Sequence, residues 1–419
     1  MTQPRRPPFK IIQQAGPTSQ PPGAVAAARG SLRLAVDATR HITGLVEALH
    51  GQIQRVAPPL RRRPATEQAL AGDADGLPRT RGLTGLVYRS IQGTTRLVGD
   101  GLDGLLAPWD AALASASSSP RRDAAVAALN GVLGDHLLRS GNPLAIPMQL
   151  RQHGQPLDLA KLGAAAPRRL LLLVHGLCMS DLGWCRNGHD HGQLLGAALG
   201  AETVYAWYNT GRHISDNGAD LADTLAQLMQ HWPHPLDELI IVGHSMGGLV
   251  ARSAIEQARK KGQSGPQSLK KLVFLGTPHH GAPLERAGNW LHRVMDVSPY
   301  VAPFTRLSRI RSEGITDLRH GNLLARDWQG ASRFDHRDLR QPLPLPAGVA
   351  CCAIASTAGS AGSAGSMLGD GLVGVDSALG RHKRQAMDLG LDKAHTWVGH
   401  TLKLCELMIE DRAAALAAA

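Results

Sequence analysis

The sequence predicts an α/β fold with a mostly parallel central sheet and helices on both faces. Short segments built almost entirely from apolar residues recur after about residue 145, and strands of this kind are buried on both sides. Segments with helical spacing of apolar residues separate them, as expected where helices connect parallel strands. Hydrophobic residues make up 43% of the 419 residues, which is enough to build such a core.

The first part of the chain is predicted to be different in kind. Residues 1–30 are rich in Pro, Gln and Gly, so we expect a disordered tail. Residues 31–140 form a helical region with three stretches of helical spacing: 31–50, 81–106 and 123–138. We expect these helices to form an amphipathic layer on the rest of the protein. Peripheral contact with a membrane is the alternative, because Arg89 and Arg96 flank the apolar stripe of the second stretch.

The remaining residues, 145–419, alternate strands with helices. A strand or hairpin is expected over 146–157. The strands predicted after it are 169–174, 203–208, 239–242, 272–275, 349–355 and 395–398. The predicted helices are 193–199, 218–231, 247–260 and 401–419. Scattered Trp, Arg and Pro break this rhythm over 284–345, which we interpret as an insertion.

Charge and cysteine content restrict the classes of function. The formal charge of +11 favours anionic partners in general. However, the arginine clusters lie outside any apolar framework and no basic stripe is interleaved with aromatic residues, so we expect no nucleic-acid partner. Five cysteines without a Cys-x-x-Cys pair indicate reduced thiols in a cytoplasmic protein. No segment has the roughly 18 consecutive apolar residues of a membrane span, and no signal-peptide core is apparent at the start.

The pattern Gly243-His244-Ser245-Met246-Gly247 is the strongest chemical signal in the chain. It follows the apolar strand 239–242 directly and comes directly before the helix 247–260. A strand, a tight turn and a helix form the setting in which a serine hydroxyl is raised above the end of a sheet. The amino end of the helix adds positive potential where an oxyanion would form. The sequence therefore predicts Ser245 as a nucleophile.

Four segments, in this order, resemble the α/β-hydrolase superfamily, and within it the bacterial lipases and the GPI inositol-deacylase-like group: LLLLVHGLCMSDLGW, LIIVGHSMGGLVAR, LVFLGTPHHGAP and GDGLVGVDSALG. The resemblance covers the chain from about residue 170 onward. It implies an α/β-hydrolase fold and a serine esterase of lipid metabolism. Such an enzyme cleaves carboxylic, lipid-like esters through an acyl-enzyme and needs neither a cofactor nor a metal ion. Its expected partner is a small-molecule ester or lipid.

The resemblance also implies the other members of the catalytic triad. A serine nucleophile needs a histidine base and an acid that holds the histidine in one tautomer. The acid is expected at Asp370, with Asp376 as its competitor. The base is expected at His400, directly before the terminal helix, with His395 and His382 as the other candidates. The family's Leu-Asp pair after the histidine is replaced here by Thr-Leu-Lys.

The oxyanion hole is expected from two backbone N–H groups, those of Leu177 and Met246. The nearby histidines are expected to fix loops rather than to bind metal: His175, His244, His279 and His280. No spacing typical of metal ligands occurs among the histidines.

The insertion 284–345 falls where caps and lids are inserted in this superfamily. A lid would bury an acyl chain and exclude water. Its expected apolar lining is Trp290, Leu291, Val294, Met295, Val297, Tyr300, Val301 and Phe304. A helical excursion packed on the sheet is the alternative for this segment. Two other functions remain open from the sequence: an acyltransferase with the same triad, and a catalytically silent hydrolase fold that binds lipid or acts as a scaffold.

Overall fold

The computed structural model describes residues 29–30, 33, 120–159, 162–163, 165–186, 188–263, 265–282, 312–330, 338–356, 373–392 and 395–399. The chain divides into two compact units. One comprises residues 1–21, 118–140 and 145–419, and the other comprises 22–117 and 141–144. In the second unit the Asn142 amide donates to the Gly30 carbonyl oxygen at 2.9 Å. The expected helices over 81–106 and 401–419 lie outside the described residues, as does the expected helix over 31–50 apart from residue 33.

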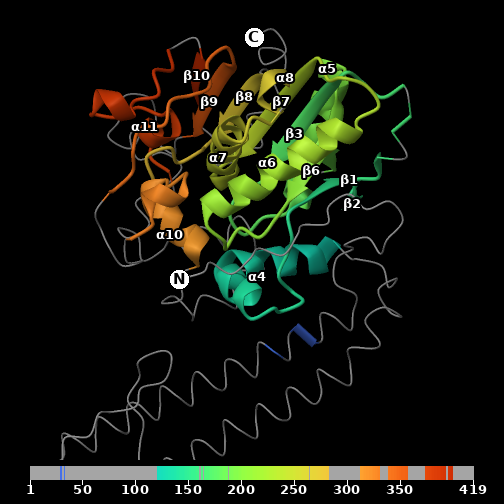
Figure 1. Cartoon of the computed structure of the whole chain (residues 1–419), viewed down its shortest axis with the longest axis horizontal. Helices are drawn as coiled ribbons and strands as arrows, with labels where there is room; N and C mark the ends of the chain where they lie inside the picture. Colours follow the sequence, from blue (N-terminus) through green and yellow to red (C-terminus); the bar gives the residue numbers. More distant parts are fainter. Residues whose placement is uncertain are drawn as a thin grey trace, which may run out of the picture. The chain divides into compact units, whose positions relative to one another are not determined.

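Eight strands in the described part of the chain form one sheet in the order β10-β9-β8-β7-β3-β6-β1-β2 (Figure 1). Their bounds are β1 Gln149–Gln152, β2 Gln155–Pro156, β3 Arg169–Val174, β6 Glu202–Trp207, β7 Glu238–His244, β8 Leu269–Leu275, β9 Ala350–Ser356 and β10 Thr396–Gly399. The run from β10 to β6 is parallel, whereas β1 pairs antiparallel with both β6 and β2. This order defines an α/β-hydrolase fold and confirms the predicted fold class.

Helices cover both faces of the sheet. The main ones are α4 Pro120–Arg139, α5 His191–Leu199, α6 Ile214–His231, α7 Met246–Lys260 and α10 Glu313–His320. Helices α6 and α7 lie together on one face (Figure 1), where their side chains meet Leu239 and Ile241 of β7. The shorter helices and turns are η2 Asp181–Trp184, α8 Gly265–Ser268, η4 Ala325–Asp327, α11 Val375–Ala378 and η6 Gln385–Met387. A small antiparallel pair, β4 Cys185–Arg186 and β5 His189–Asp190, lies between η2 and α5.

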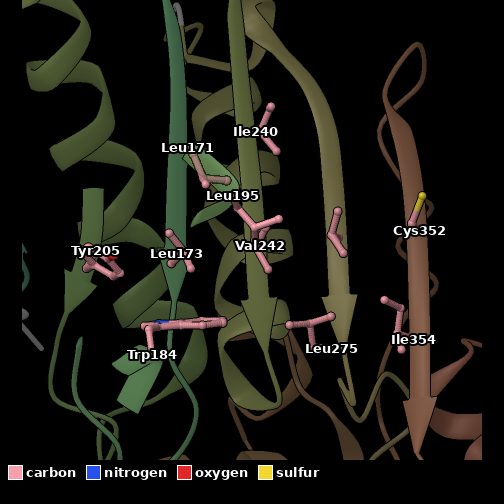
Figure 2. Packing of buried hydrophobic residues seen from close by; sticks show 11 residues of the cluster. Leu171, Leu173, Trp184, Leu195, Tyr205, Ile240, Val242, Leu275, Cys352 and Ile354 are labelled. Carbon is pink, nitrogen blue, oxygen red and sulfur yellow. The ribbon is translucent and has the colours of Figure 1, made fainter. Parts of the chain in front are cut away.

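The opposite face of the sheet packs against α5. Successive strand residues point to opposite faces, so Ile240 and Val242 of β7 face away from α6 and α7. They join a buried cluster that runs across the strands from β6 to β9 and includes Leu195 of α5 (Figure 2). Trp184 of η2 belongs to the same cluster and lies at the level of the carboxyl ends of β3 and β7 (Figure 2). The loop after β3 is thereby tied to the core of the sheet.

The helix expected over 123–138 is α4, and it belongs to the same compact unit as the sheet. Its buried residues include Val126, Leu129, Val132 and Leu137. No helix in the described part of the chain is long and apolar enough to cross a membrane.

Candidate active site

Ser245 occupies the turn between β7 and α7 with φ 51° and ψ −122°. A residue other than glycine at positive φ is uncommon and marks local strain. Hydrogen bonds at both the N–H and the carbonyl group of Ser245 stabilise this strained backbone conformation. The Ser245 N–H donates to the Leu275 carbonyl oxygen at 2.8 Å, and the Ser245 carbonyl oxygen accepts from the Gly248 N–H at 3.1 Å. These bonds hold the serine at the carboxyl edge of the sheet, as the sequence pattern predicts.

The two glycines that flank the serine are required by close backbone approach. A Cβ atom on Gly243 would lie 2.5 Å from the Cα atom of Gly248, and one on Gly247 would lie 2.1 Å from the carbonyl oxygen of Val174. Neither contact involves a side chain that could move aside. The turn can therefore be this tight only with glycine two residues before and two residues after Ser245.

The loop after β3 reaches Ser245. A Cβ atom on Gly176 would lie 3.1 Å from the Cβ atom of Ser245, so the backbone of this loop is in contact with the serine. Leu177, the next residue, is buried. Within the described part of the chain, neither its N–H nor the N–H of Met246 at the start of α7 donates a hydrogen bond. The N–H of Cys178, in contrast, donates to Thr210 Oγ1 at 3.1 Å. Two N–H groups that donate no hydrogen bond in the described part of the chain thus belong to Met246, which follows the serine, and to Leu177, which follows the glycine in contact with it. These are the two residues expected to form an oxyanion hole.

Two histidines beside the serine are built into the structure as neutral groups. The His175 ring is fully buried and stacks on Tyr208 with ring centroids 4.5 Å apart. Burial lowers the pKa of His175 to about 4. His244 packs edge-on against Trp184, and desolvation lowers its pKa to about 4 as well. Neither ring is suited to take a proton near neutral pH, which agrees with the structural role expected for both.

The turn after β8 is fixed by buried polar contacts. Arg252 Nη1 lies 3.1 Å from His279 Nδ1, and burial lowers the pKa of His279 well below its usual range. The N–H of His280 donates to Ser377 Oγ at 3.0 Å. Ser377 lies in α11, so the segment that follows β9 is attached to this turn at the carboxyl edge of the sheet.

The expected acid and base, Asp370 and His400, lie outside the described residues, as does the expected lid lining of 290–304. Asp376, the competing acid, lies in the first turn of α11 with an exposed carboxylate, 4.0 Å from Arg381 Nη1. His395 Nδ1 lies 2.6 Å from Asp392 Oδ1. His382, the other candidate base, accepts a hydrogen bond from the Arg384 N–H at 3.0 Å.

The strand register shows which end of β10 borders the edge that carries the serine. Trp397 pairs with Ile354, Ile354 with Leu275, and Leu275 with His244, so Trp397 is level with the residue before Ser245. His395 precedes Trp397 by two positions, which is about 7 Å toward the amino ends of the strands. The chain reaches the carboxyl edge at Gly399, the residue that precedes His400 in the sequence.

The described part of the insertion borders Met246. A Cβ atom on Gly314, in the first turn of α10, would lie 3.1 Å from Met246 Cε. Asp317 of α10 accepts the Ile214 N–H at 2.8 Å and lies 3.0 Å from His213 Nδ1. Burial alone would lower the pKa of His213, but the hydrogen bond and charge of Asp317 raise it above its usual value. The insertion is therefore docked on the amino end of α6, next to the candidate oxyanion hole.

Sequence reasoning missed a buried ion cluster beside this site. Arg151 of β1 is fully buried, and its guanidinium pairs with Asp181 of η2 and with Asp123 of α4, each at 3.0 Å. No local pattern signals these pairs, because the partners lie 28 and 30 residues from the arginine along the chain. In the described part of the chain, no group of three or more potential metal-ligating side chains comes together.

Comparison with known proteins supplies the last observations. A family model described as "Domain of unknown function (DUF7379)" matches residues 136–309. No curated protein sequence matches the chain. Solved structures similar to it include the mature lipase BlEst2 of Bacillus licheniformis, with 20% identity over 60% of this chain and 92% of that one, at a TM-score of 0.38.

Two clostridial proteins show a similar degree of likeness. A lipase-esterase related protein of Clostridium acetobutylicum is 12% identical over 61% of this chain and 94% of its own, at a TM-score of 0.33. EstA of Clostridium botulinum is 14% identical over 61% and 87%, at a TM-score of 0.35. Two of the structural neighbours named here are thus described as a lipase and as a lipase-esterase related protein.

Proposed function

We propose that this protein is a serine hydrolase that cleaves carboxylic, lipid-like esters. The observation that carries the proposal is the strained Ser245, held at the carboxyl edge of the sheet with Gly176 against its Cβ atom. A structural serine gains nothing from a backbone conformation that costs about 1–3 kcal/mol, whereas a nucleophile gains exposure of its hydroxyl at the sheet edge.

In the proposed reaction, Ser245 Oγ attacks the ester carbonyl carbon while His400 takes the hydroxyl proton. The carbonyl oxygen becomes an oxyanion that accepts from the N–H groups of Leu177 and Met246. The C–O bond to the alcohol then breaks, and the histidine returns its proton to the leaving oxygen. Water attacks the acyl-enzyme through the same histidine, which releases the acid and restores Ser245. Asp370 holds the histidine in the tautomer that this sequence requires.

The register of β10 supports His400 as the base in this proposal. The strand reaches the serine-bearing edge at Gly399, and His400 is the next residue. His395 lies toward the other end of the strand and is already hydrogen-bonded to Asp392. For the acid, the exposed carboxylate of Asp376 near Arg381 favours Asp370. We further propose that the partner of this protein is a small-molecule ester or lipid, that the protein contacts membranes peripherally, and that it is located in the cytoplasm.

The test is turnover of nitrophenyl esters of increasing acyl length by the wild type and by Ser245→Ala. We expect the wild type to hydrolyse them and the variant to lose at least about 10³-fold in kcat, as removal of a triad serine does. A variant that keeps full activity would show that another group carries the reaction. Addition of an alcohol acceptor separates a hydrolase from an acyltransferase, because only the transferase forms a new ester in preference to the acid.

A further inference from the structure

The buried guanidinium of Arg151 connects three elements behind the candidate site. Arg151 lies on β1, Asp181 begins η2, and Asp123 lies in the first turn of α4. The guanidinium also lies over the Trp207 ring, 4.1 Å from its centroid. Burying one cation and two carboxylates is costly unless each ion is paired, so these three residues constrain one another strongly.

Asp181 closes the loop that carries the candidate oxyanion donor. The loop leaves β3 at Val174, contacts Ser245 at Gly176 and turns into η2 at Asp181. Leu177 precedes Asp181 by four residues. Along the loop, the Leu177 N–H therefore lies between the contact of Gly176 with Ser245 and the ion pair of Asp181.

Helix α4 supports the same loop from behind. A Cβ atom on Gly131 would lie 2.2 Å from Cys178 Sγ and 3.0 Å from its Cα atom, so the helix backbone touches the loop directly. Cys178 itself has φ 60°, a conformation that an unsupported cysteine would leave. The loop is thus held by the sheet, by α4 and by the segment around Thr210.

We propose that Arg151 is a positioning residue for the oxyanion hole: through Asp181 it holds the loop after β3 so that the Leu177 N–H faces the reacting carbonyl beside Ser245. This inference rests on the proposed function for its catalytic consequence. Arginine suits the position because its planar guanidinium donates to two carboxylates on different elements at once, which a lysine ammonium on a flexible stem does less well.

The chain provides a matched pair of variants, because Asp181 and Asp123 are bonded to the same guanidinium at the same distance and are equally buried. Each asparagine variant leaves Arg151 paired with one aspartate, so that the two remaining charges cancel. Asp181 lies on the loop, whereas Asp123 lies eight residues from Gly131 along α4, about 12 Å away. Steady-state kinetics, thermal unfolding and amide hydrogen exchange at Cys178 are measured on the full chain for both variants.

We expect both variants to lower Tm by similar amounts, but only Asp181→Asn to lower kcat, by about tenfold or more with KM within twofold, since removing a whole oxyanion donor costs about 10²–10³. Exchange at the Cys178 N–H should rise in Asp181→Asn alone. If that variant fails to fold, Arg151→Lys should show the same loss of kcat and of protection.

Unchanged kcat and unchanged exchange in Asp181→Asn, or an equal loss of kcat in Asp123→Asn, would overturn the positioning role. Failure of the wild type to hydrolyse any ester is a different result. It would refute the proposed function, and with it the catalytic consequence of the ion pair, whatever the exchange data show about the loop.

Discussion

At the scale of single residues, the site is organised around a serine that the backbone holds in a strained position. The strain is possible because the groups around it are fixed: Gly247 lies against the Val174 carbonyl oxygen, and the Ser245 N–H is bonded to Leu275. The neighbouring rings of His175 and His244 are kept neutral by desolvation. In the proposed reaction, the proton of the serine therefore goes to a histidine from a different segment, His400.

Paired substitutions at the acid and the base test this assignment. Asp370→Asn should reduce kcat far more than Asp376→Asn, because only a carboxylate aligned with the imidazole fixes its tautomer. His400→Ala should be nearly inactive, whereas His395→Ala, which removes a ring bonded to Asp392, should keep most activity. Steady-state kinetics on a soluble ester provide the measurement. The reverse order within either pair would reassign that member of the triad.

At the scale of elements, α4 is the part of the chain whose role changes most once the structure is known. The sequence gives it only helical spacing. In the structure its glycine face lies against two loops at the carboxyl edge of the sheet: a Cβ atom on Gly134 would lie 1.8 Å from Asn209 Oδ1, just as one on Gly131 would meet Cys178. The Gly131 carbonyl oxygen also accepts from Ser312 Oγ at 2.7 Å, which ties α4 to the insertion.

Gly131→Ala tests the close approach of α4 to the loop. In an ordinary helix this change stabilises by about 1 kcal/mol. Here we expect the opposite sign, a loss of about 1–3 kcal/mol from overpacking, together with a fall in kcat as the loop is displaced. Adding Cys178→Ala removes the sulfur that would lie 2.2 Å from the new Cβ atom. The double variant should therefore recover part of the lost stability and part of the lost kcat. Denaturant unfolding and ester turnover give the result, and a higher stability in the single variant would contradict the packing described here.

The order of the elements could be predicted from the sequence because central strands such as β3, β7 and β8 contain short apolar runs, and segments with helical spacing separate them. Their ends could be predicted less well. Helix α6 starts at Ile214 rather than at 218, because the Ile214 N–H is bonded to Asp317 from the distant α10. The expected strand or hairpin at 146–157 is the antiparallel pair β1 and β2, whose turn places both His153 and Gly154 at positive φ. Such boundaries depend on tertiary contacts and local turn geometry.

The candidate site likewise has a part that could be predicted from the sequence and a part that could not. The positions of Ser245 and Met246 could be predicted, since they follow from a local strand–turn–helix pattern, and the resemblance to lipases indicates Leu177 in the loop after β3. Their roles in the reaction stay predictions. The Arg151 cluster could not, because an arginine in a short strand signals an exposed residue unless its two acidic partners are known. The distinction is physical: chemistry set by backbone shape is visible in the sequence, whereas chemistry set by contact between distant segments is not.

At the scale of the whole molecule, the buried histidines link stability to pH. The folded-state pKa of His175 is about 4, below its unfolded value of 6.5, so the unfolded chain binds more protons between these limits. Stability should therefore be lost as the pH falls from about 6.5 to about 4, on the order of 3 kcal/mol from His175 alone. The lowered pKa of His279 acts in the same direction. His213, with its raised pKa, acts in the opposite direction. Its stabilising contribution is fully present below pH 6.5, the unfolded pKa, and is lost as the pH rises through the folded pKa.

Denaturant unfolding at pH 7.5, 6 and 5 measures this dependence. The free energy of unfolding should decrease at each step. His175→Phe keeps a ring against Tyr208 but has no proton to bind, so its stability should fall less steeply with acid than that of the wild type. Identical slopes for the two proteins would show that His175 titrates normally in the folded state.

The central claim, that Ser245 is an activated nucleophile, is tested most directly by labelling the folded protein with a fluorophosphonate. The reagent needs both an activated serine and an oxyanion hole, and it needs no knowledge of the natural ester. The structure predicts one covalent adduct, located on Ser245 by peptide mass spectrometry and absent from Ser245→Ala and from heat-unfolded protein. No adduct on the folded wild type, or an adduct that persists in the alanine variant, would contradict the account.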